Sequence, residues 1–271
     1  MFFVVSKPAK SLLLCKIKLV VNMQIKNYQQ NFLRSTFTAE WNNWSCGKNQ
    51  GLPMPEKQKP YDTKAKLIDL VSPEQFIFDL KLLDAIKYRR SRRKFSQDFL
   101  TLKELAFLLW ATQGITNEAI DFHRAVPSAG ARHPFVTYIV GKRVENLTPG
   151  VYRYLPLDHK LCLVSQQSDI PEKIAISCLE INQTQVQGAA VVFVWAAIPY
   201  RTSWRFGPYA DKFIAIESGH LGQNLYLAAE AIGAGVCAIA AYDQDAVDKI
   251  IEVDGKDEFA IYLATVGKVK R

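Results

Sequence analysis

The sequence predicts a fold of the α+β class. β-type segments follow one another directly at 135–141, 150–155 and 160–164, with turn residues between them, which is typical of hairpins. Further along, between residues 189 and 267, β-type segments are separated by helical ones. Hairpin strands and helix-separated strands in one chain indicate α+β. The chain has 271 residues, 49% of them apolar, enough for one large or two small domains with a buried core.

The first helical segments carry clear start and stop signals. The stretch LKLLDAIKYR, residues 80–89, is amphipathic with helical spacing. Thr101 followed by Glu104 forms a capping-box pattern, which predicts the start of a helix. Gly114 then predicts the end of that helix, because glycine is favoured just past a helix C-terminus.

The strands of the middle of the chain follow. FVTYIVG (135–141) predicts one strand and GVYRYL (150–155) a second, after a turn at Pro149 and Gly150. KLCLV (160–164) is its expected hairpin partner. AAVVFVWAA (189–197) is apolar on both faces, so we expect a fully buried strand.

The remaining elements alternate. We expect one helix over PEKIAISCLEI (171–181), with Pro171 at its first position. Residues 210–233 predict a long helix that is apolar nearly all round, which places it centrally or against a second subunit. The last predicted elements are a strand at 235–242, a helix capped by Asp243, and a strand at 259–267.

Residues 1–80 are predicted to form a basic N-terminal extension, and residues 81–271 the main domain. Residues 47–75 contain four prolines and little periodicity, which predicts an extended, irregular segment on or beside the domain. Residues 23–45 are predicted to be helical. Lysines divide the apolar patches of residues 1–22 too often for a signal peptide, so we interpret this stretch as a disordered tail or a misassigned start.

The net charge of +8 lies in the N-terminal part of the chain. Residues 1–66 contain eleven Lys and Arg against three Asp and Glu, whereas residues 67–271 contain 23 of each. Nucleic-acid binders usually spread cations over a whole face, so this balance argues against a nucleic-acid partner. No segment offers about 20 uninterrupted apolar residues, so we expect no membrane association.

Cysteine usage indicates the compartment. The five cysteines, at positions 15, 46, 162, 178 and 237, form no C-x-x-C pair, and no Cys/His group has metal-ligand spacing. We therefore predict no metal site. Scattered free thiols suit a reducing compartment, so we expect a cytoplasmic protein.

The stretch KYRRSRRKF, residues 87–95, contains six cations in nine residues. Within it, Arg89, Ser91 and Arg93 alternate. Two guanidinium forks with a hydroxyl between them can surround one phosphate. The same residues also fit a solvated helix end, where arginines interact favourably with the helix dipole. The pattern alone leaves both interpretations open.

Two stretches of small residues are candidate contacts for a flat ligand. In VPSAGARHP (126–134), small side chains would let a ligand approach backbone N–H groups, although an ordinary tight loop fits equally well. His133 is interpreted as structural. GAGVCAIAAYD (233–243) formally matches G-x-G-x-x-A. A dinucleotide fingerprint needs a strand, glycines and then a helix, whereas here a helix precedes a strand, so we reject that interpretation.

Three further features stay open. Gly219 and Gly222 allow a helix or ligand to approach the long helix closely, and His220 between them is more typical of a core histidine than of a catalyst. Lys268 and Arg271 directly follow the last strand. Terminal cations are usually solvated, but these two could complete a phosphate site.

Taken together and in order, these pieces resemble the nitroreductase family of FMN-dependent oxidoreductases, and more narrowly its SagB-type dehydrogenase branch. The resemblance covers about residues 82–271 and rests on RRSRRKF, LTLKELAFLLWATQGIT, RAVPSAGARHPFVTYIV, NLTPGVYRYLP, ESGHLGQNLYLAAEAIGAGVCAIAAYD and LATVGKVKR. It implies a central mixed, mainly antiparallel sheet flanked by helices. It also implies a homodimer with FMN at the subunit interface.

The resemblance assigns roles to particular residues. The FMN phosphate and ribityl chain would be held by Arg89, Arg90, Ser91 and Arg93. The isoalloxazine ring would be bordered by Pro127, Ser128, Ala129, Gly130 and Ala131. Its other edge, near N5, would face Ala238, Ile239, Ala240 and Ala241. Lys268 and Arg271 would reach the phosphate.

The implied activity is hydride transfer through flavin N5 to or from a small organic substrate, with NAD(P)H as a candidate reductant. One alternative is an azoline-oxidase-like tailoring dehydrogenase that acts on a peptide or biosynthetic intermediate, with residues 23–80 forming part of the substrate groove. That branch is known for a catalytic Lys-Tyr pair, for which Lys212 and Tyr209 are the nearest candidates. Another alternative is a non-catalytic flavin- or partner-binding module. Many family members have a C-terminal extension that embraces the partner, whereas this sequence ends at Arg271.

Overall fold

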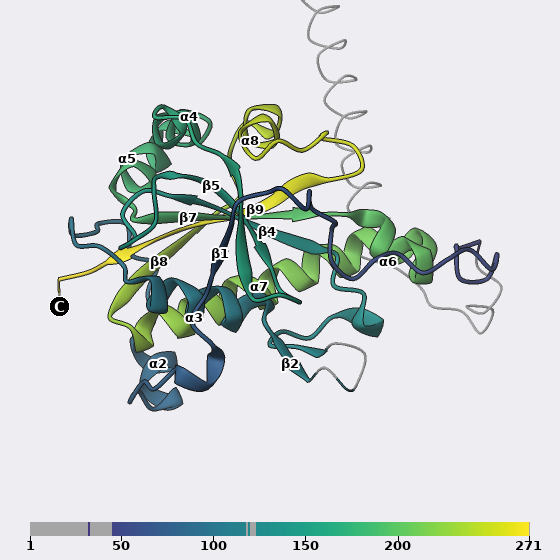
Figure 1. Ribbon diagram of the computed structural model, residues 1–271, viewed down its shortest axis with the longest axis horizontal. Helices are drawn as coiled ribbons and strands as arrows, with labels where there is room; N and C mark the ends of the chain where they lie inside the picture. Colours follow the sequence, from purple (N-terminus) through teal and green to yellow (C-terminus); the bar gives the residue numbers. More distant parts are fainter. Residues whose placement is uncertain (1–31, 33–44, 118, 120–122, 271) are drawn as a thin grey trace, which may run out of the picture. The chain divides into compact units, whose positions relative to one another are not determined.

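The computed structural model describes residues 32, 45–117, 119 and 123–270 (Figure 1). The helix expected over 23–45 and the terminal Arg271 lie outside the described residues. The chain divides into two compact units between Ser45 and Cys46. The second unit carries the domain, and residues 46–80 belong to it.

A seven-stranded sheet forms the centre of this unit, in the order β1-β6-β5-β4-β7-β9-β8. All of its paired strands run antiparallel. The strands are β1 (Leu67–Asp69), β4 (Phe135–Gly141), β5 (Gly150–Leu155), β6 (Lys160–Ser165), β7 (Val191–Ala197), β8 (Ala234–Ile239) and β9 (Phe259–Lys268). The expected α+β, mainly antiparallel architecture is therefore confirmed.

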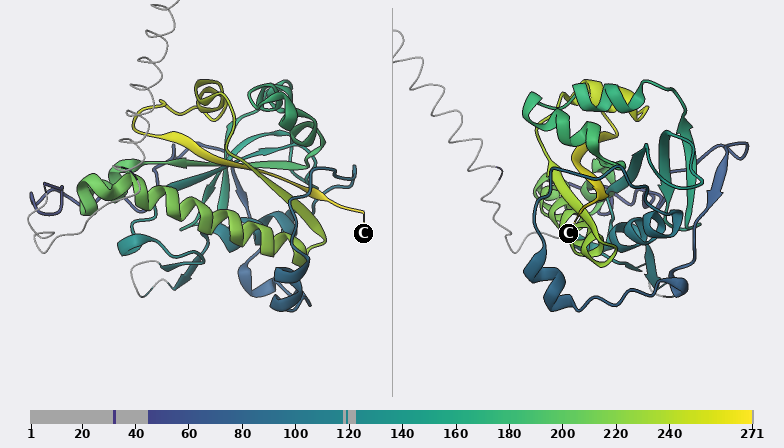
Figure 2. Two further views of the ribbon diagram at one scale, coloured as in Figure 1. Left: turned by 180° about the vertical axis from the view of Figure 1, so that it is seen from behind. Right: turned by 90° about the vertical axis from the view of Figure 1, so that its left-hand side faces the viewer.

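Helices cover both faces of the sheet, as the views in Figures 1 and 2 show. One face is covered by α3 (Leu102–Gln113) and the long α7 (Ala210–Ala231), with α2 (Leu82–Tyr88) beside them. The other face is covered by α4 (Ile170–Ile176), α5 (Glu180–Gly188) and α8 (Gln244–Ile250). The remaining elements are α6 (Pro199–Phe206), a small sheet of β2 (Ile115–Asn117) and β3 (His123–Arg124), and the 3-10 turns η2 (Pro73–Gln75), η3 (Ala129–Ala131) and η4 (Gly207–Tyr209).

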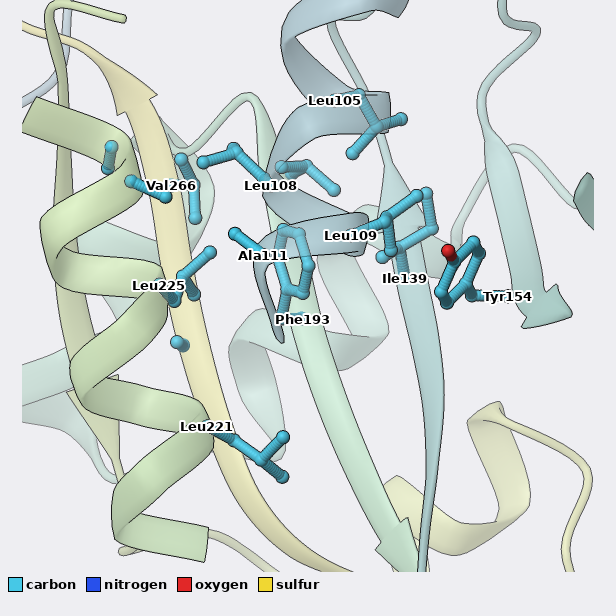
Figure 3. Close-up of a cluster of buried hydrophobic side chains, with 14 of the residues drawn as sticks. Leu105, Leu108, Leu109, Ala111, Ile139, Tyr154, Phe193, Leu221, Leu225 and Val266 are labelled. Atoms are coloured by element: carbon cyan, nitrogen blue, oxygen red, sulfur yellow. The ribbon is translucent and has the colours of Figure 1, made fainter. Parts of the chain in front are cut away.

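The cover on both faces explains why β7 is apolar throughout. All seven of its residues are buried, including Phe193 and Trp195. Figure 3 shows Leu108 and Leu109 of α3, Phe193 of β7 and Leu225 of α7 within one cluster of buried side chains. Burying such side chains contributes roughly 1.5–3 kcal/mol each. This core fixes α7 against the sheet and so positions everything that α7 contacts.

The helix predicted over 171–181 is wrong in one respect, because the chain forms two helices there. Helix α4 ends at Ile176, and residues 177–179 pair with residues 241–243. The Leu179 N–H donates to the Ala241 carbonyl at 3.3 Å, and the Asp243 N–H donates to the Ser177 carbonyl at 2.7 Å. The same pairing ends β8 at Ile239, three residues before the predicted end of that strand. Pro171 occupies the second helical position rather than the first.

Residues 46–80 are extended, as expected, but they are integral to the domain. Strand β1 pairs with β6 at the edge of the main sheet. Further back, the carbonyls of Lys57 and Pro60 accept hydrogen bonds from the buried Arg124 and Arg153, at 2.7 and 2.8 Å. Removing this segment would therefore remove a strand and leave buried donors unpaired.

Candidate functional site

The basic segment 89–96 crosses one end of strands β8 and β9 and is held there by its backbone. The Arg92 N–H donates to the Val236 carbonyl at 2.8 Å, and the Ser96 N–H donates to the Lys268 carbonyl at 2.8 Å. Glycines allow this close approach, because a Cβ on Gly235 would lie 2.7 Å from Cδ of Arg92. The backbone thus fixes the segment without using its cationic side chains.

Tyr226 of α7 joins this segment to β8. Its hydroxyl lies 3.0 Å from the Ser91 Oγ and accepts a hydrogen bond from the Ala238 N–H at 3.0 Å. The Arg89 guanidinium lies over the Tyr226 ring, 5.2 Å from its centroid, in a cation–π contact. Sequence reasoning missed Tyr226. The available signal was a polar-tipped aromatic residue on a helix that also carries charged and polar residues, and that signal has no specificity alone.

The arginines of the segment have different partners. Arg90 donates to the carbonyls of Lys87 and Arg89 at 3.0 and 2.7 Å, which is the helix-end role considered above. Arg92, which was not among the predicted ligands, pairs with the buried Glu230 at 3.6 Å. Within the described part of the chain, no carboxylate pairs with Arg89 or Arg93. Those two cations, with Ser91 between them, are available to an anion.

Lys268 is already engaged in this structure. Its Nζ forms a salt bridge with Glu104 and donates to the Ile232 carbonyl at 2.7 Å. Glu104 also completes the capping box of α3, since its Oε2 accepts from the Thr101 N–H at 2.9 Å. A phosphate contact from Lys268 would therefore require its release from Glu104.

The loop of small residues forms the turn η3. Gly130 and Ala131 adopt positive φ values of 56° and 53°, which present backbone groups in a sharp turn. The Ala129 N–H donates to Oε1 of Glu217 at 2.8 Å, and Nδ1 of His220 lies 3.4 Å from the Pro127 carbonyl oxygen. Burial raises the pKa of the Glu217 carboxyl. Helix α7 therefore holds this loop as well.

His133 has a structural role, as the sequence indicated. It is buried, and its N–H donates to the Ser128 Oγ at 2.8 Å. Burial, together with the charges of Arg124, Arg132 and Arg201, lowers the pKa of His133 to about 3. The imidazole is therefore neutral at physiological pH and does not serve there as a proton donor.

The two candidate regions share α7 but contact it at different points. Glu217 and Tyr226 are nine residues apart, which is about 14 Å along a helix axis. Near Tyr226, Ala238 is partly exposed and Ile239 is packed in the core. Ala240 and Ala241 are exposed and follow the end of β8. Of the predicted ring-edge residues, Ala238 contacts the Tyr226 cluster directly.

Lys212 and Tyr209 lie at the other end of α7. Tyr209 ends η4, and Lys212 is in the first turn of the helix. Lys212 precedes Tyr226 by fourteen residues, or about 21 Å along the axis. It precedes Glu217 by only five, or about 8 Å. Within one chain, the pair is therefore nearer to the loop of small residues than to Ser91.

A comparison with protein families identifies the class of protein. The model of the nitroreductase family matches residues 86–268. The chain therefore belongs to the nitroreductase family. A protein of Methanocaldococcus jannaschii assigned as a nitroreductase, MJ1384, is 31% identical over 192 residues, covering 71% of this chain and 93% of that one. The trifolitoxin-processing protein TfxB of Rhizobium leguminosarum is 24% identical over 163 residues, covering 59% of this chain and 43% of TfxB.

Solved structures share the fold. A protein of Anabaena variabilis assigned as a nitroreductase has a TM-score of 0.66 at 25% identity, over 79% of this chain and 44% of that one. A chain of the Escherichia coli microcin synthetase McbBCD complex with truncated pro-MccB17 bound has a TM-score of 0.58 at 17% identity, over 94% of each chain. A protein assigned as a nitroreductase from Desulfovibrio desulfuricans, in complex with FMN, has a TM-score of 0.50 at 14% identity, over 71% and 88%.

The described residues offer neither a candidate membrane span nor a candidate metal site. Among the described helices, none is both long and apolar enough to cross a membrane. No three His, Cys, Asp or Glu side chains in the described ranges gather closely enough to hold a metal ion. The four described cysteines, at positions 46, 162, 178 and 237, are free and buried.

Proposed function

We propose that this member of the nitroreductase family is an FMN-dependent oxidoreductase. The observation that carries the proposal is the Tyr226 cluster. There, one hydroxyl joins Ser91 to the Ala238 N–H beside the Arg89 guanidinium, and neither Arg89 nor Arg93, two residues beyond Ser91 in the sequence, has a carboxylate partner among the described residues. Guanidinium and hydroxyl groups that lie close together are suitable hydrogen-bond donors to a phosphate.

The residues present fit FMN at both of its ends. Arg89, Ser91 and Arg93 would hold the phosphate and ribityl chain, joined by Arg90 and Lys268 if these leave their present partners, and by Arg271. Small side chains would border the flat ring, with Pro127, Ser128, Ala129, Gly130 and Ala131 on one side and Ala238, Ile239, Ala240 and Ala241 on the other. When bound, FMN supplies hydride transfer at N5.

In this activity the protein itself binds and orients the cofactor and the substrate. Glu217 holds the Ala129 N–H and so fixes the turn that would face the ring. Tyr226 fixes the relative position of Ser91 and Ala238, and therefore of the phosphate end and the ring edge. The cations nearby would favour an anionic, reduced flavin. Substrate binds beside the ring, where small residues leave room, and NAD(P)H is the candidate reductant.

We also propose a homodimer. Helix α2 exposes Leu82, Leu83 and Ile86, and α7 exposes Ile216 beside Gly219. Exposed apolar residues gathered on one helix, as on α2, are typical of interaction surfaces. Both helices adjoin the proposed FMN region, so a second copy packed on them would cover it.

The free thiols fit a reducing compartment, and we propose a cytoplasmic location.

An absorption spectrum of the purified, untagged protein tests the cofactor assignment. We expect flavin bands, and release of FMN on denaturation as identified by mass spectrometry. A Ser91→Ala and Arg93→Ala double variant should lose the bands, whereas Lys103→Ala, at an exposed cation of α3, should keep them. A colourless protein that does not take up added FMN would overturn the proposal and favour a non-catalytic partner-binding module.

A tailoring dehydrogenase is the second candidate. It is supported by the similarity to TfxB, whose name describes trifolitoxin processing, and by the fold shared over 94% of both chains with a microcin synthetase component. Lys212 and Tyr209, near the loop of small residues, are its candidate catalytic groups. In this activity a substrate loses a hydride and a proton, and an external acceptor such as O₂ finally receives the electrons.

The two candidate activities predict different electron donors. A general oxidoreductase would oxidise NAD(P)H rapidly in the presence of a small acceptor. A tailoring enzyme would oxidise NAD(P)H poorly, and would instead lower the mass of a heterocycle-containing peptide by two hydrogen atoms. Lys212→Ala should abolish the peptide reaction while FMN stays bound, because Lys212 lies far from Ser91 along α7. Deleting residues 23–80 is not a clean test, since β1 and the segment over Arg124 would be lost.

A further inference from the structure

A small cavity, lined in part by buried side chains, lies at the end of strands β4 and β5, outside the proposed FMN region. Its volume is about 10 Å³, which is room for a single water-sized particle. Residues 57–60, called the strap below, cross over it and are fastened at both ends by the carbonyls of Lys57 and Pro60. The side chains relevant here are those of Gln113, Arg124, Thr137, Arg153 and Arg201.

Three buried arginines line this cavity. Arg124, Arg153 and Arg201 are only 8%, 6% and 4% exposed. A buried guanidinium normally pairs with a carboxylate, because burying an uncompensated charge is costly. None of these three has a carboxylate partner among the described residues. Three positive charges therefore lie around one small cavity.

The hydrogen bonds of the three arginines go to neutral oxygens. Arg124 donates to Oε1 of Gln113 and to the Lys57 carbonyl, and Arg153 donates to the Pro60 carbonyl. Arg201 donates to the His133 carbonyl at 3.3 Å. These contacts satisfy donors but neutralise no charge.

The one buried carboxylate nearby is already engaged. Glu258 forms a salt bridge with Lys59 at 2.5 Å and accepts a hydrogen bond from the Tyr138 hydroxyl at 2.9 Å. It therefore compensates the strap lysine, and its charge, with that of the exposed Glu56, also acts on Arg201 and raises the pKa of that group. The cluster keeps an excess of positive charge.

Two polar atoms at the cavity have no partner. Oγ1 of Thr137 and Nε of Arg124 are buried without a hydrogen bond in the described structure. Thr137 is only 2% exposed, so solvent does not satisfy its hydroxyl. Unpaired buried polar atoms of this kind indicate a missing water or ion.

We propose that this cavity binds one small anion of about the size of chloride. The anion would accept hydrogen bonds from the Thr137 hydroxyl and from guanidinium groups, and it would neutralise part of the arginine cluster. A water molecule would satisfy the same donors but would leave the charge unchanged. A cavity this small favours a monatomic anion over phosphate or sulfate.

Burial supports the need for a counter-ion. Burial, and the charge of Arg201, lower the pKa of Arg124 to about 9. Burial also lowers the pKa of Arg201 to about 10. Both groups nevertheless stay charged at neutral pH, so loss of protons does not remove the positive charge of the cluster.

The anion would also fasten the strap. The strap carbonyls point at arginines whose mutual repulsion opposes their closeness, and an anion between them removes that repulsion. Chloride should therefore stabilise the folded protein and protect the strap from proteolysis. This role does not depend on FMN, so a test of the anion site does not test the proposed function, and the reverse also holds.

Thermal unfolding of the full-length protein tests the site, with chloride replaced by gluconate at constant ionic strength. A ligand that binds only the folded state raises the midpoint in proportion to the logarithm of its concentration. We expect the midpoint to rise by several degrees with chloride. Bromide-soaked crystals should give an anomalous peak between Thr137 and Arg124. Equal midpoints in the two salts, or water alone in the cavity, would overturn the proposal.

Variants separate this site from general salt effects. Thr137→Val keeps the side-chain shape and removes the unpaired hydroxyl, so we expect the chloride requirement to rise about five- to tenfold. Arg124→Gln should abolish the chloride response. Arg143→Gln is the matched control, because Arg143 is also buried but donates to the Ser96 and Gly188 carbonyls elsewhere. A chloride response that Thr137→Val and Arg143→Gln change equally would contradict the assignment.

Discussion

The hydroxyl of Tyr226 lies 3.0 Å from the hydroxyl of Ser91. This contact joins the basic segment to the long helix α7. Since the Ala238 N–H donates to the same Tyr226 oxygen, the basic segment, α7 and β8 meet at one atom. The cationic motif is therefore part of a built cluster, and is not merely a solvated helix end.

Tyr226→Phe should weaken FMN binding while keeping the fold. Phenylalanine retains the ring beneath Arg89 but removes the oxygen that orients Ser91 and Ala238. A lost hydrogen bond costs about 1 kcal/mol, so we expect about a five- to tenfold higher Kd. Quenching of flavin fluorescence, titrated into apoprotein, measures this. Tyr152→Phe is the matched control, because that hydroxyl donates to the Thr148 carbonyl away from the cluster.

Arg93→Ala should weaken FMN binding more than Arg90→Ala does. Arg93 has no partner among the described residues and is exposed, whereas Arg90 donates to carbonyls at the end of α2. A charge-assisted hydrogen bond contributes about 1.5–3 kcal/mol, so we expect roughly a ten- to hundredfold loss for Arg93→Ala. Titration at low and high salt should show that the difference shrinks with screening. Equal losses would mean that Arg90 leaves the helix end to bind the phosphate.

His133→Asn should make the protein less sensitive to acid. The folded-state pKa of His133 is about 3, against an ordinary value of 6.5 in the unfolded chain, so the unfolded chain binds the extra proton between these two values. Stability is therefore full above about pH 6.5 and is lost as the pH falls toward 3. At pH 5 this loss is about 2 kcal/mol for the wild type and absent in the variant.

Denaturant unfolding of both proteins from pH 7.5 to pH 5 provides the measurement for His133. Asparagine is the suitable replacement, because it tolerates the positive φ of 47° at this position. Parallel stability curves for wild type and variant would show that the imidazole is protonated in the folded protein.

Local signals predicted most of the fold. The Thr101–Glu104 box and Gly114 mark the ends of α3, and the apolar run at 135–141 coincides with β4. Both depend on residues adjacent in the sequence. The break after Ile176 could not be predicted in this way, because it arises from pairing with residues 241–243. That pairing is a tertiary effect, and it overrides helical periodicity.

The candidate site was predicted only in part for the same reason. Arg89, Ser91 and Ala238 were identified from their residue types and from the family resemblance. Tyr226 was not, because its importance depends on α7 passing between the basic segment and β8. Likewise, nothing local indicates that Lys268 pairs with Glu104, 164 residues away. The spacing of residues along the sequence does not indicate which side chains contact each other in the folded protein.

Gly219→Leu should dissociate the proposed dimer. Gly219 is exposed on α7, and an added Cβ would meet nothing within 4 Å, so a single chain accepts a side chain there. Leucine should even stabilise the helix by up to about 1 kcal/mol relative to glycine. If a second copy packs on this face, however, leucine prevents close approach of the two helices. Light scattering after size exclusion would then show monomer, and the flavin content would fall.

Thr184→Leu is the control for Gly219→Leu, because it adds the same side chain to an exposed position of α5 on the opposite face of the sheet. That variant should remain dimeric and yellow. A Gly219→Leu protein that is dimeric, flavin-bound and more stable than wild type would show that α7 faces solvent at this point. The exposed leucines of α2, Leu82 and Leu83, would then be the surface to mutate, because they are the other apolar face beside the Tyr226 cluster.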